Sequence, residues 1–417
     1  MYVFFVMENT LKYLPPISKY HRKISLDDWF ESTKYYDQGN YYKSLIHLLR
    51  YINGPVPIPD TPSISLKIPH GSVYVNIQAD AEKFKVSVPF LKFIPGSVKV
   101  AAMRQMIEQN FSTLILGQIV LKGEELWYEY EDKTSNCEPY KIYYMLDELC
   151  TQADNNDDYY IDRFKLDHVE KPVLDQFTPT EYSKAESEFK EIISEGLKYA
   201  DYFEKNRWYN LTCDVLAITF FRLRHVTFPQ GLLARELQDA LSGMYANDSV
   251  NNIILAAREN MAKFSGYDSV KFKESLFHPQ FFMPIKPRAE IPRLQELFEN
   301  TFNNTTAWMS SHSYIDTAVL LTYEFYNAMD LYFLTPDVMT AIENTLSKAS
   351  GKDWKSASEI LYRLIQKIME IELDQEGNMV KGSLAEFQSN AGGTEIKSAA
   401  ASSAKSIFSK ISSLFKG

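Results

Sequence analysis

The sequence lacks the motifs around which most known enzyme sites are built. Only 16 of its 417 residues are glycine, and no Gly-x-Gly-x-x-Gly turn, Walker loop or Gly-x-Ser-x-Gly elbow is present. This excludes the common nucleotide-binding and hydrolase turns. No two of the seven histidines stand within five positions of each other, so a His-x-x-x-His metal helix is excluded as well. We therefore expect no enzyme, no cofactor and no metal site.

Cysteine and long apolar runs are also scarce. Cys137, Cys150 and Cys213 are too few for a disulfide framework and indicate a reducing compartment. No segment reaches the ~20 apolar residues of a membrane-spanning helix. The first seven residues are apolar but have no basic start, which is unlike a signal peptide; Met7 is an alternative start to Met1. We expect a cytoplasmic, bacterial protein.

The charge balance is acidic. Forty-four Lys and Arg face 54 Asp and Glu, for a formal net charge of −10. Such a surface repels polyphosphate, so we expect no nucleic-acid partner. A hydrophobic content of 45% and a charged content of 24% are typical of folded globular chains, and the length predicts two or three domains.

Residues 24–168 have the pattern of helices packed on one face of an antiparallel sheet, preceded by a short segment over 1–23. Period-two alternation predicts strands near 64–68, 73–77, 84–88, 113–121 and 125–130. Helices are expected as a pair over 25–52 with a turn at Gly39, over 97–110, and after Pro139. The 97–110 helix carries four apolar residues on one face, Val100, Met103, Met106 and Ile107. The order α-βββ-α-ββ-α is an α+β layer fold.

The two last strands carry a resemblance to a known family. Residues 111–121 (Phe-Ser-Thr-Leu-Ile-Leu-Gly-Gln-Ile-Val-Leu) lead to Glu-Leu-Trp-Tyr-Glu-Tyr at 125–130 and a closing helix. This region, about 24–168, resembles the YbjN and type III secretion chaperone superfamily. Its members are small non-enzymatic chaperones or adaptors that commonly dimerise and bind extended client segments. The resemblance implies the same role here, although this chain adds a long C-terminal region.

One strand of that hairpin has an unusual polar face. Alternation places Trp127, Glu129 and Glu131 on one side and Tyr128 and Tyr130 on the other. The first side is either an ordinary solvent-facing surface or an acidic-aromatic strip that binds a basic or extended partner segment, including by strand addition. Were the protein an enzyme, Glu129 or Glu131 would be the candidate acid.

A polar segment over 154–175 separates this domain from the next. Its first residues, Asp-Asn-Asn-Asp-Asp at 154–158, suggest a calcium loop because positions 1, 3 and 5 offer oxygen ligands. An EF-hand then needs Gly sixth and Glu twelfth, where this chain has Tyr159 and Lys165. We therefore expect a solvated loop.

Residues 176–373 are patterned as helices throughout. Thr178 and Glu181 form a capping box with Pro179 in the first turn. Stretches about 200–260 and 305–370 share features at an offset of 105 residues, such as the dipeptides starting at 208 and 313. This indicates a duplicated helical unit stacked as an α-solenoid; chance similarity is the alternative.

The C-terminal end changes in composition. Residues 374–399 are rich in Gly, Ser, Asn and Gln and read as a flexible linker, and 400–417 form an amphipathic basic helix. Its apolar face comprises Ile407, Phe408, Ile411, Leu414 and Phe415, and its lysines are Lys405, Lys410 and Lys416. This tail could fold back on the body, dock into a partner groove, or contact a membrane surface weakly at the inner membrane face.

These patterns together predict a non-enzymatic binding protein. The main expectation is an adaptor or chaperone that holds a protein client and docks through its tail, with a homodimer as one assembly state. The first alternative is a structural scaffold subunit of a larger assembly. The second is an enzyme whose site forms only in three dimensions.

Overall fold

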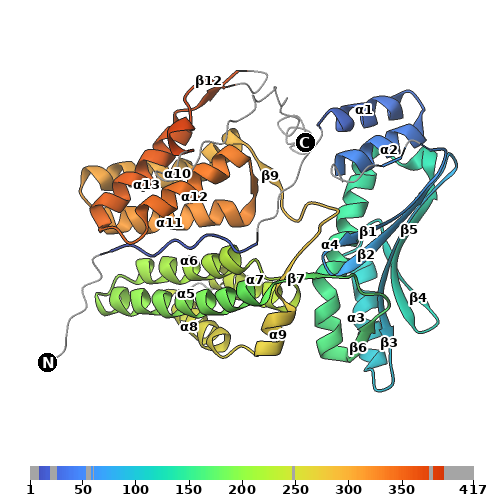
Figure 1. The fold of residues 1–417 in the computed structure, drawn as a ribbon, viewed down its shortest axis with the longest axis horizontal. Helices are drawn as coiled ribbons and strands as arrows, with labels where there is room; N and C mark the ends of the chain where they lie inside the picture. The colour runs from blue at the N-terminus through green and yellow to red at the C-terminus, as the bar shows by residue number, and fades with distance from the viewer. Residues whose placement is uncertain are drawn as a thin grey trace.

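The computed structural model describes residues 9–18, 26–52, 58–59, 61–246, 249–374 and 379–388. An α+β unit and a larger helical unit lie side by side, with the helices following the sheet in the chain (Figure 1). The expected fold class is therefore confirmed.

The α+β unit is built on one antiparallel sheet. Its strands are ordered β1 (Ile64–His70), β2 (Val73–Ala79), β3 (Lys83–Phe93), β5 (Glu125–Lys133) and β4 (Gln118–Lys122), and β6 (Leu166–His168) pairs with the end of β3. The register places Ile77 opposite Val86, and Val86 opposite Tyr130. These residues are buried, so the period-two pattern correctly marked the core face.

Helices cover that face, and Pro139 starts the longest of them. They are α1 (Leu26–Asp37), α2 (Tyr41–Ile52), α3 (Lys99–Ser112) and α4 (Pro139–Phe164), with a 3₁₀ turn at Thr134–Asn136. Figure 1 shows α4 running along the sheet. Gly39 has φ of 75°, the left-handed conformation that glycine adopts at little cost, and it joins α1 to α2 as expected.

The expected strand over 113–121 is shorter in the structure. It begins only at Gln118 because the backbone of the preceding turn is bound by a side chain instead of a neighbouring strand. Glu148 accepts hydrogen bonds from the N–H groups of Ile115 at 2.7 Å and Gly117 at 2.8 Å. A carboxylate thus satisfies groups that a sheet would otherwise pair.

The expected solvated loop at 154–158 is wrong. These residues are helical and continue α4 to Phe164, where Lys165 closes the helix with φ of 56°. Asp157 is fully buried. Asp and Asn favour loops because their side chains compete for backbone hydrogen bonds. Here Asp154 and Asp158 accept hydrogen bonds from Ser72 and Leu232 outside α4, and Asp157 accepts from Ser72 as well as from the Asp158 N–H. The partners outside the helix reduce this competition.

The helical unit consists of two similar halves. The first comprises α5 (Pro179–Lys205), α6 (Tyr209–Thr227), α7 (Gly231–Tyr245), α8 (Val250–Ser265) and the short α9 (Ser269–Glu274). The second comprises α10 (Ile291–Ser310), α11 (Tyr314–Leu331), α12 (Pro336–Ala349) and α13 (Trp354–Met369). Short pairings complete the unit: β7 (Asp175–Gln176) with β8 (Phe277–His278), β9 (Arg288–Ala289) with β10 (Phe333–Leu334), and β11 (Glu372–Leu373) with β12 (Met379–Lys381), followed by a 3₁₀ turn at Ala385–Phe387.

The two halves use the same turn between their first two helices. Arg207 has φ of 63° and His312 has φ of 62°, and each is followed by the helix N-cap. The N–H of Trp208 donates to the Phe203 carbonyl at 2.9 Å, and that of Ser313 donates to the Trp308 carbonyl at 2.9 Å. The turns are 105 residues apart, which is the offset seen in the sequence. The duplicated helical unit expected at this offset stays a prediction.

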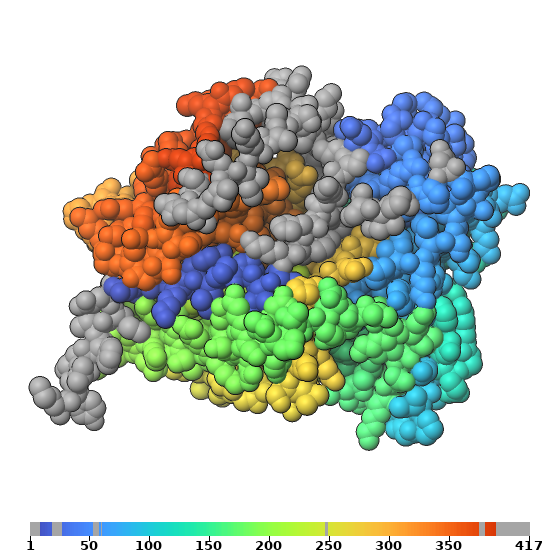
Figure 2. Space-filling model, viewed as in Figure 1, coloured from blue at the N-terminus to red at the C-terminus, as the bar shows by residue number. Residues whose placement is uncertain are grey.

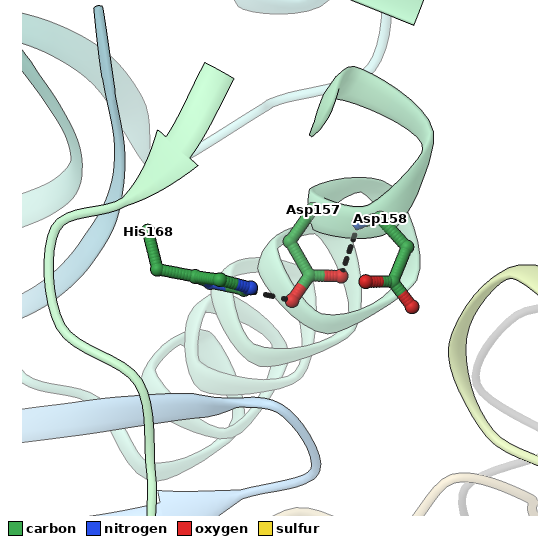
Figure 3. Close-up of side chains that lie close together, drawn as sticks. All are labelled: Asp157, Asp158 and His168. Carbon is green, nitrogen blue, oxygen red and sulfur yellow. Dashed lines mark hydrogen bonds and ion pairs between the residues drawn. The ribbon is translucent and has the colours of Figure 1, made fainter. Parts of the chain in front are cut away.

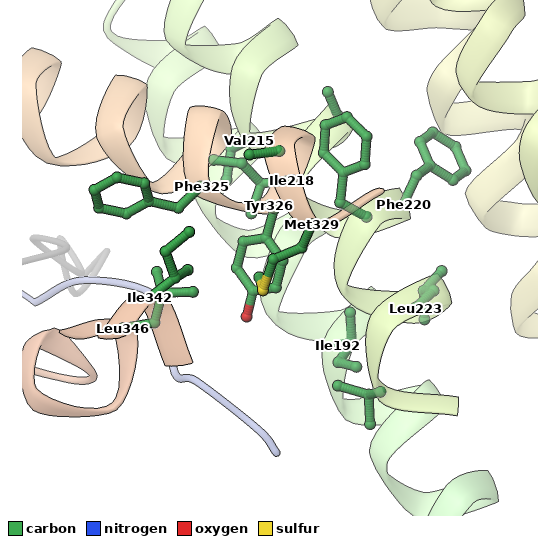
Figure 4. Packing of buried hydrophobic residues seen from close by; sticks show 14 of the residues in the cluster. Ile192, Val215, Ile218, Phe220, Leu223, Phe325, Tyr326, Met329, Ile342 and Leu346 are labelled. Carbon is green, nitrogen blue, oxygen red and sulfur yellow. The ribbon is translucent and has the colours of Figure 1, made fainter. Parts of the chain in front are cut away.

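The halves pack through α6 and α11. In Figure 4, Tyr326 and Met329 of α11 lie against Val215 and Ile218 of α6. All four side chains are almost fully buried. The close packing makes the two halves one core rather than an open solenoid.

A segment far away in sequence runs along the seam between the halves. We call residues 9–18 the strap; Figures 1 and 2 show it in dark blue between the green and orange helices. The hydroxyl of Thr10 donates to the Ala349 carbonyl at 2.7 Å, and the N–H of Ile17 donates to the Val226 carbonyl at 2.9 Å. The strap therefore binds both halves.

The segment between α9 and α10, which joins the two halves, packs against the α+β unit. Phe282 and Met283 are buried in the sheet core rather than in the helical core. The N–H of Gly71 donates to the Gln280 carbonyl at 2.9 Å, and that of Met283 donates to His70 Nδ1 at 3.2 Å. The two units are thus fixed to each other at the tip of the β1–β2 hairpin.

Candidate functional site

The outer side of α3 carries an exposed apolar surface. Val100, Ile107 and Phe111 are spaced by seven and four residues, so they share one side of the helix, and Ile115 lies in the loop that follows the helix. Their exposed fractions are 67%, 50%, 87% and 88%. We call these four residues the α3 face. Single exposed apolar side chains are ordinary, whereas several in one region make a candidate interaction site.

Only part of the apolar face expected on α3 is buried. Met106 is buried, together with Ala102, and Met103 packs partly buried against the sheet core, while Val100 and Ile107 are exposed. The helix has apolar residues on more than one side, and those on the outer side remain exposed to solvent.

The sheet edge beside the α3 face is closed at its centre. The side chain of Asn110 accepts from the Ile119 N–H at 2.7 Å and donates to the Ile119 carbonyl at 3.0 Å. An amide side chain thereby occupies the position of an added strand. Strand addition along β4 would have to displace it, so this edge favours side-chain docking over strand pairing.

The acidic-aromatic strip on β5 lies on the open face of the sheet as predicted, with Tyr128 and Tyr130 buried on the other side. Lysines neutralise it within the molecule. Lys122 Nζ lies 2.6 Å from Glu129 and 4.6 Å from the centre of the Trp127 ring, and Lys83 Nζ lies 2.7 Å from Glu131. The strip offers a basic partner little unpaired negative charge.

One of these lysines also shifts the pKa of a carboxyl group in the strip. The hydrogen bond from Lys83 holds the pKa of Glu131 below its usual value. A general acid needs a raised pKa near the working pH. The environment of Glu131 favours a permanent anion instead.

The expected tail residues lie outside the described part of the chain. These are Lys405, Ile407, Phe408, Lys410, Ile411, Leu414, Phe415 and Lys416. Of the linker expected over 374–399, residues 375–378 and 389–399 lie outside that part as well, whereas 379–388 contain β12 and a 3₁₀ turn. The structure neither brings the tail residues to nor separates them from the α3 face.

A second cluster lies where the two units meet. Asp154, Asp157 and Asp158 stand at positions i, i+3 and i+4 of α4, so they share one side of the helix. Figure 3 shows His168 of β6 facing Asp157. Ser72, at the tip of the β1–β2 hairpin, completes the group. We call these five residues the junction cluster. The sequence did not predict this cluster. The spacing of the aspartates at i, i+3 and i+4 was the available signal, because it places all three on one side of a helix.

Hydrogen bonds join the junction cluster to its surroundings. The Ser72 hydroxyl lies 2.8 Å from Asp154 Oδ1 and 2.5 Å from Asp157 Oδ2. The N–H of Leu232, at the start of α7, donates to Asp158 Oδ2 at 3.2 Å. Gly231 lies so close that a Cβ there would be 1.9 Å from the same oxygen. Asp158 thus connects α4 with α7.

Burial shifts the pKa values in the junction cluster. It raises the pKa of Asp154 to about 6 and raises the pKa values of Asp157 and Asp158 above their usual range. It lowers the pKa of His168 to about 4, with a contribution from the charge of Lys171. Burial disfavours the charged form of each group, so the imidazole is neutral at pH 7.

No family model matches the chain, and no curated protein matches it significantly.

Proposed function

We propose that the protein is a non-enzymatic adaptor or chaperone that binds an apolar segment of a client protein on the α3 face. The observation that carries this proposal is the exposure of Phe111 and Ile115, at 87% and 88%. Apolar and aromatic anchors of this kind supply most of the binding energy at protein interfaces. The resemblance of residues 24–168 to secretion chaperones supports the same role.

The surroundings of the α3 face favour an uncharged client segment. Lys99 at the start of α3 is paired with Glu124 at 2.8 Å, so its charge is already matched. Asn110 closes the neighbouring sheet edge. A client would therefore be held by apolar side chains rather than by charge or by backbone pairing.

We place this adaptor in the cytoplasm. Its three cysteines are free, and Cys137 and Cys150 are buried, as suits a reducing compartment. Among the described helices, none combines the length and apolarity needed to cross a bilayer. The C-terminal tail remains our second docking element, for the client assembly or a membrane surface, and nucleic acid is not proposed as a partner.

The test compares full-length protein with the double variant Phe111→Ser/Ile115→Ser and with the matched control Val173→Ser. Val173 is 94% exposed, so its change has the same chemistry outside the α3 face. Each client found by tagged pull-down is purified and titrated against all three proteins by calorimetry. We expect the face variant to bind roughly 10-fold to 100-fold more weakly, and the control to bind as the wild type does.

Two results would count against the proposal. Equal affinity of the face variant and the wild type would show that the client binds elsewhere. A wild type that dimerises through this face in sedimentation experiments, while the variant stays monomeric, would favour the scaffold alternative instead.

A further inference from the structure

The junction cluster has the composition of a metal site. We propose that Asp157, Asp158 and His168 bind one divalent transition-metal ion, Zn²⁺ or Mn²⁺, between α4 and β6. One ligand atom of each residue lies within 4.8 Å of the others. This inference revises the expectation that the protein has no metal site, and it is independent of the α3 face.

The histidine points to an ion rather than to a hydrogen bond. His168 is 9% exposed, and its Nδ1 has no hydrogen-bond partner among the described residues. This nitrogen faces the Asp157 carboxylate at 3.9 Å (Figure 3). The distance is too long for a hydrogen bond, yet it is close to the roughly 3.4 Å that separates two ligands of a tetrahedral zinc ion with bonds of about 2.1 Å.

The charges in the junction cluster call for a cation. Among the described residues, no lysine or arginine forms an ion pair with Asp157 or Asp158. The Ser72 N–H donates to Asp154 Oδ1 at 2.6 Å, the Ser72 hydroxyl lies 2.5 Å from Asp157 Oδ2, and the Asp158 N–H donates to Asp157 Oδ1 at 2.7 Å. All of these donors are neutral, and a buried carboxylate is more stable beside a positive charge. An ion held by Asp157 and Asp158 would supply that charge.

The donor set selects the class of ion. One neutral imidazole nitrogen and two carboxylate oxygens suit Zn²⁺, Mn²⁺ and related ions. Ca²⁺ prefers six to eight oxygen ligands, which these three residues do not provide. Because Asp158 also accepts from Leu232 of α7, the ion would strengthen the junction between the α+β and helical units.

The test uses the full chain after treatment with a chelator. Zn²⁺, Mn²⁺, Mg²⁺ and Ca²⁺ are each titrated by calorimetry, and bound metal is measured by elemental analysis after gel filtration. We expect one Zn²⁺ or Mn²⁺ per chain, weaker binding of Mg²⁺ and Ca²⁺, and a higher melting temperature with the bound ion. Co²⁺ bound at the same site should give a visible absorption spectrum typical of Co²⁺ with nitrogen and oxygen ligands.

Variants assign the site. Asp157→Asn and His168→Gln should weaken binding by about 100-fold or more, because each removes one of three protein ligands. Asp157→Asn keeps the shape and removes a buried charge, so we expect the metal-free variant to fold. The matched controls are Asp201→Asn and His278→Gln. In the wild type, Asp201 is paired with Arg258 at 2.7 Å, and His278 is paired with Glu181 at 3.4 Å. The absence of binding to the wild type, or binding unchanged in both ligand variants, would overturn the proposal.

Discussion

The ion pair between Arg222 and Glu195 allows a sharp test of how the seam of the helical unit is held. Arg222 is 1% exposed; its Nη2 lies 2.7 Å from Glu195 and donates to the Lys12 carbonyl of the strap at 2.6 Å. In the part of the chain that the structure describes, its Nε and Nη1 have no hydrogen-bond partner. Glu195 is less enclosed, with 16% of its side chain exposed, and it also accepts from the Lys12 N–H at 3.2 Å.

Because Arg222 is more deeply buried than Glu195, we expect the free energy of unfolding to fall by different amounts when one or the other is replaced. Glu195→Ala leaves a fully buried guanidinium without a counter-charge, which costs about 3–5 kcal/mol. Arg222→Met removes the buried charge and keeps most of the volume. The remaining carboxylate has water and the Lys12 N–H, so we expect a cost of about 1–2 kcal/mol. The double variant should resemble Arg222→Met, because it contains no unpaired buried charge.

The assay is urea unfolding followed by circular dichroism. With a slope of about 2.5 kcal/mol per molar urea, the midpoint should fall by roughly 1.5 M for Glu195→Ala and roughly 0.5 M for Arg222→Met. The reasoning fails if Arg222→Met is the more damaging change. It also fails if adding Arg222→Met to Glu195→Ala restores no stability.

Three further predictions concern single positions. Burial, with the negative charge of Glu324 nearby, raises the pKa of the Asp214 carboxyl to about 7. The protonated carboxyl favours folding below the pKa of the unfolded state, near 4, and this stabilisation is lost as the pH rises to about 7. Asp214→Asn should therefore gain melting temperature relative to the wild type between about pH 4 and pH 7, and a constant difference would contradict this. A Cβ on Gly196 would lie 2.1 Å from Thr219 Oγ1, so Gly196→Ala should lose about 1–3 kcal/mol in urea unfolding, with partial rescue by Thr219→Ala. Thr178→Ala breaks the capping box of α5 and should cost about 1 kcal/mol; no shift in the urea midpoint would show that the cap is dispensable.

The local pattern of apolar and polar residues predicted those strands, helices and turns whose conformation depends on residues close by in the sequence. The first three strands alternate because one face of the sheet is covered, and the turn at Gly39 needs only its own backbone. The start of β4 escaped this reasoning. Its boundary is set by Glu148, which binds the backbone of Ile115 and Gly117 from another helix, and a side chain more than thirty residues away leaves no local signal.

The candidate sites show the same limit. Sequence could find the apolar residues of α3 but not which stripe would meet the sheet, because that depends on the packing of α4 and β4. The aspartates of the junction cluster were visible as a group. Their burial was not, since it depends on α7 and on the hairpin tip at Ser72. The side assignments of Trp127, Glu129 and Glu131 followed from strand alternation, but their neutralising lysines come from strands β3 and β4.

The position of the strap has a consequence for biosynthesis. Thr10 binds the carbonyl of Lys352, and these residues are 342 positions apart. At roughly 5–20 residues per second, the ribosome needs about 17–70 s to make the second partner after the first. The early segment must remain accessible for that time, so chaperones that bind nascent chains have a window in which to hold it. A premature stop before residue 349 would remove the partner of Thr10 and leave the seam unfinished.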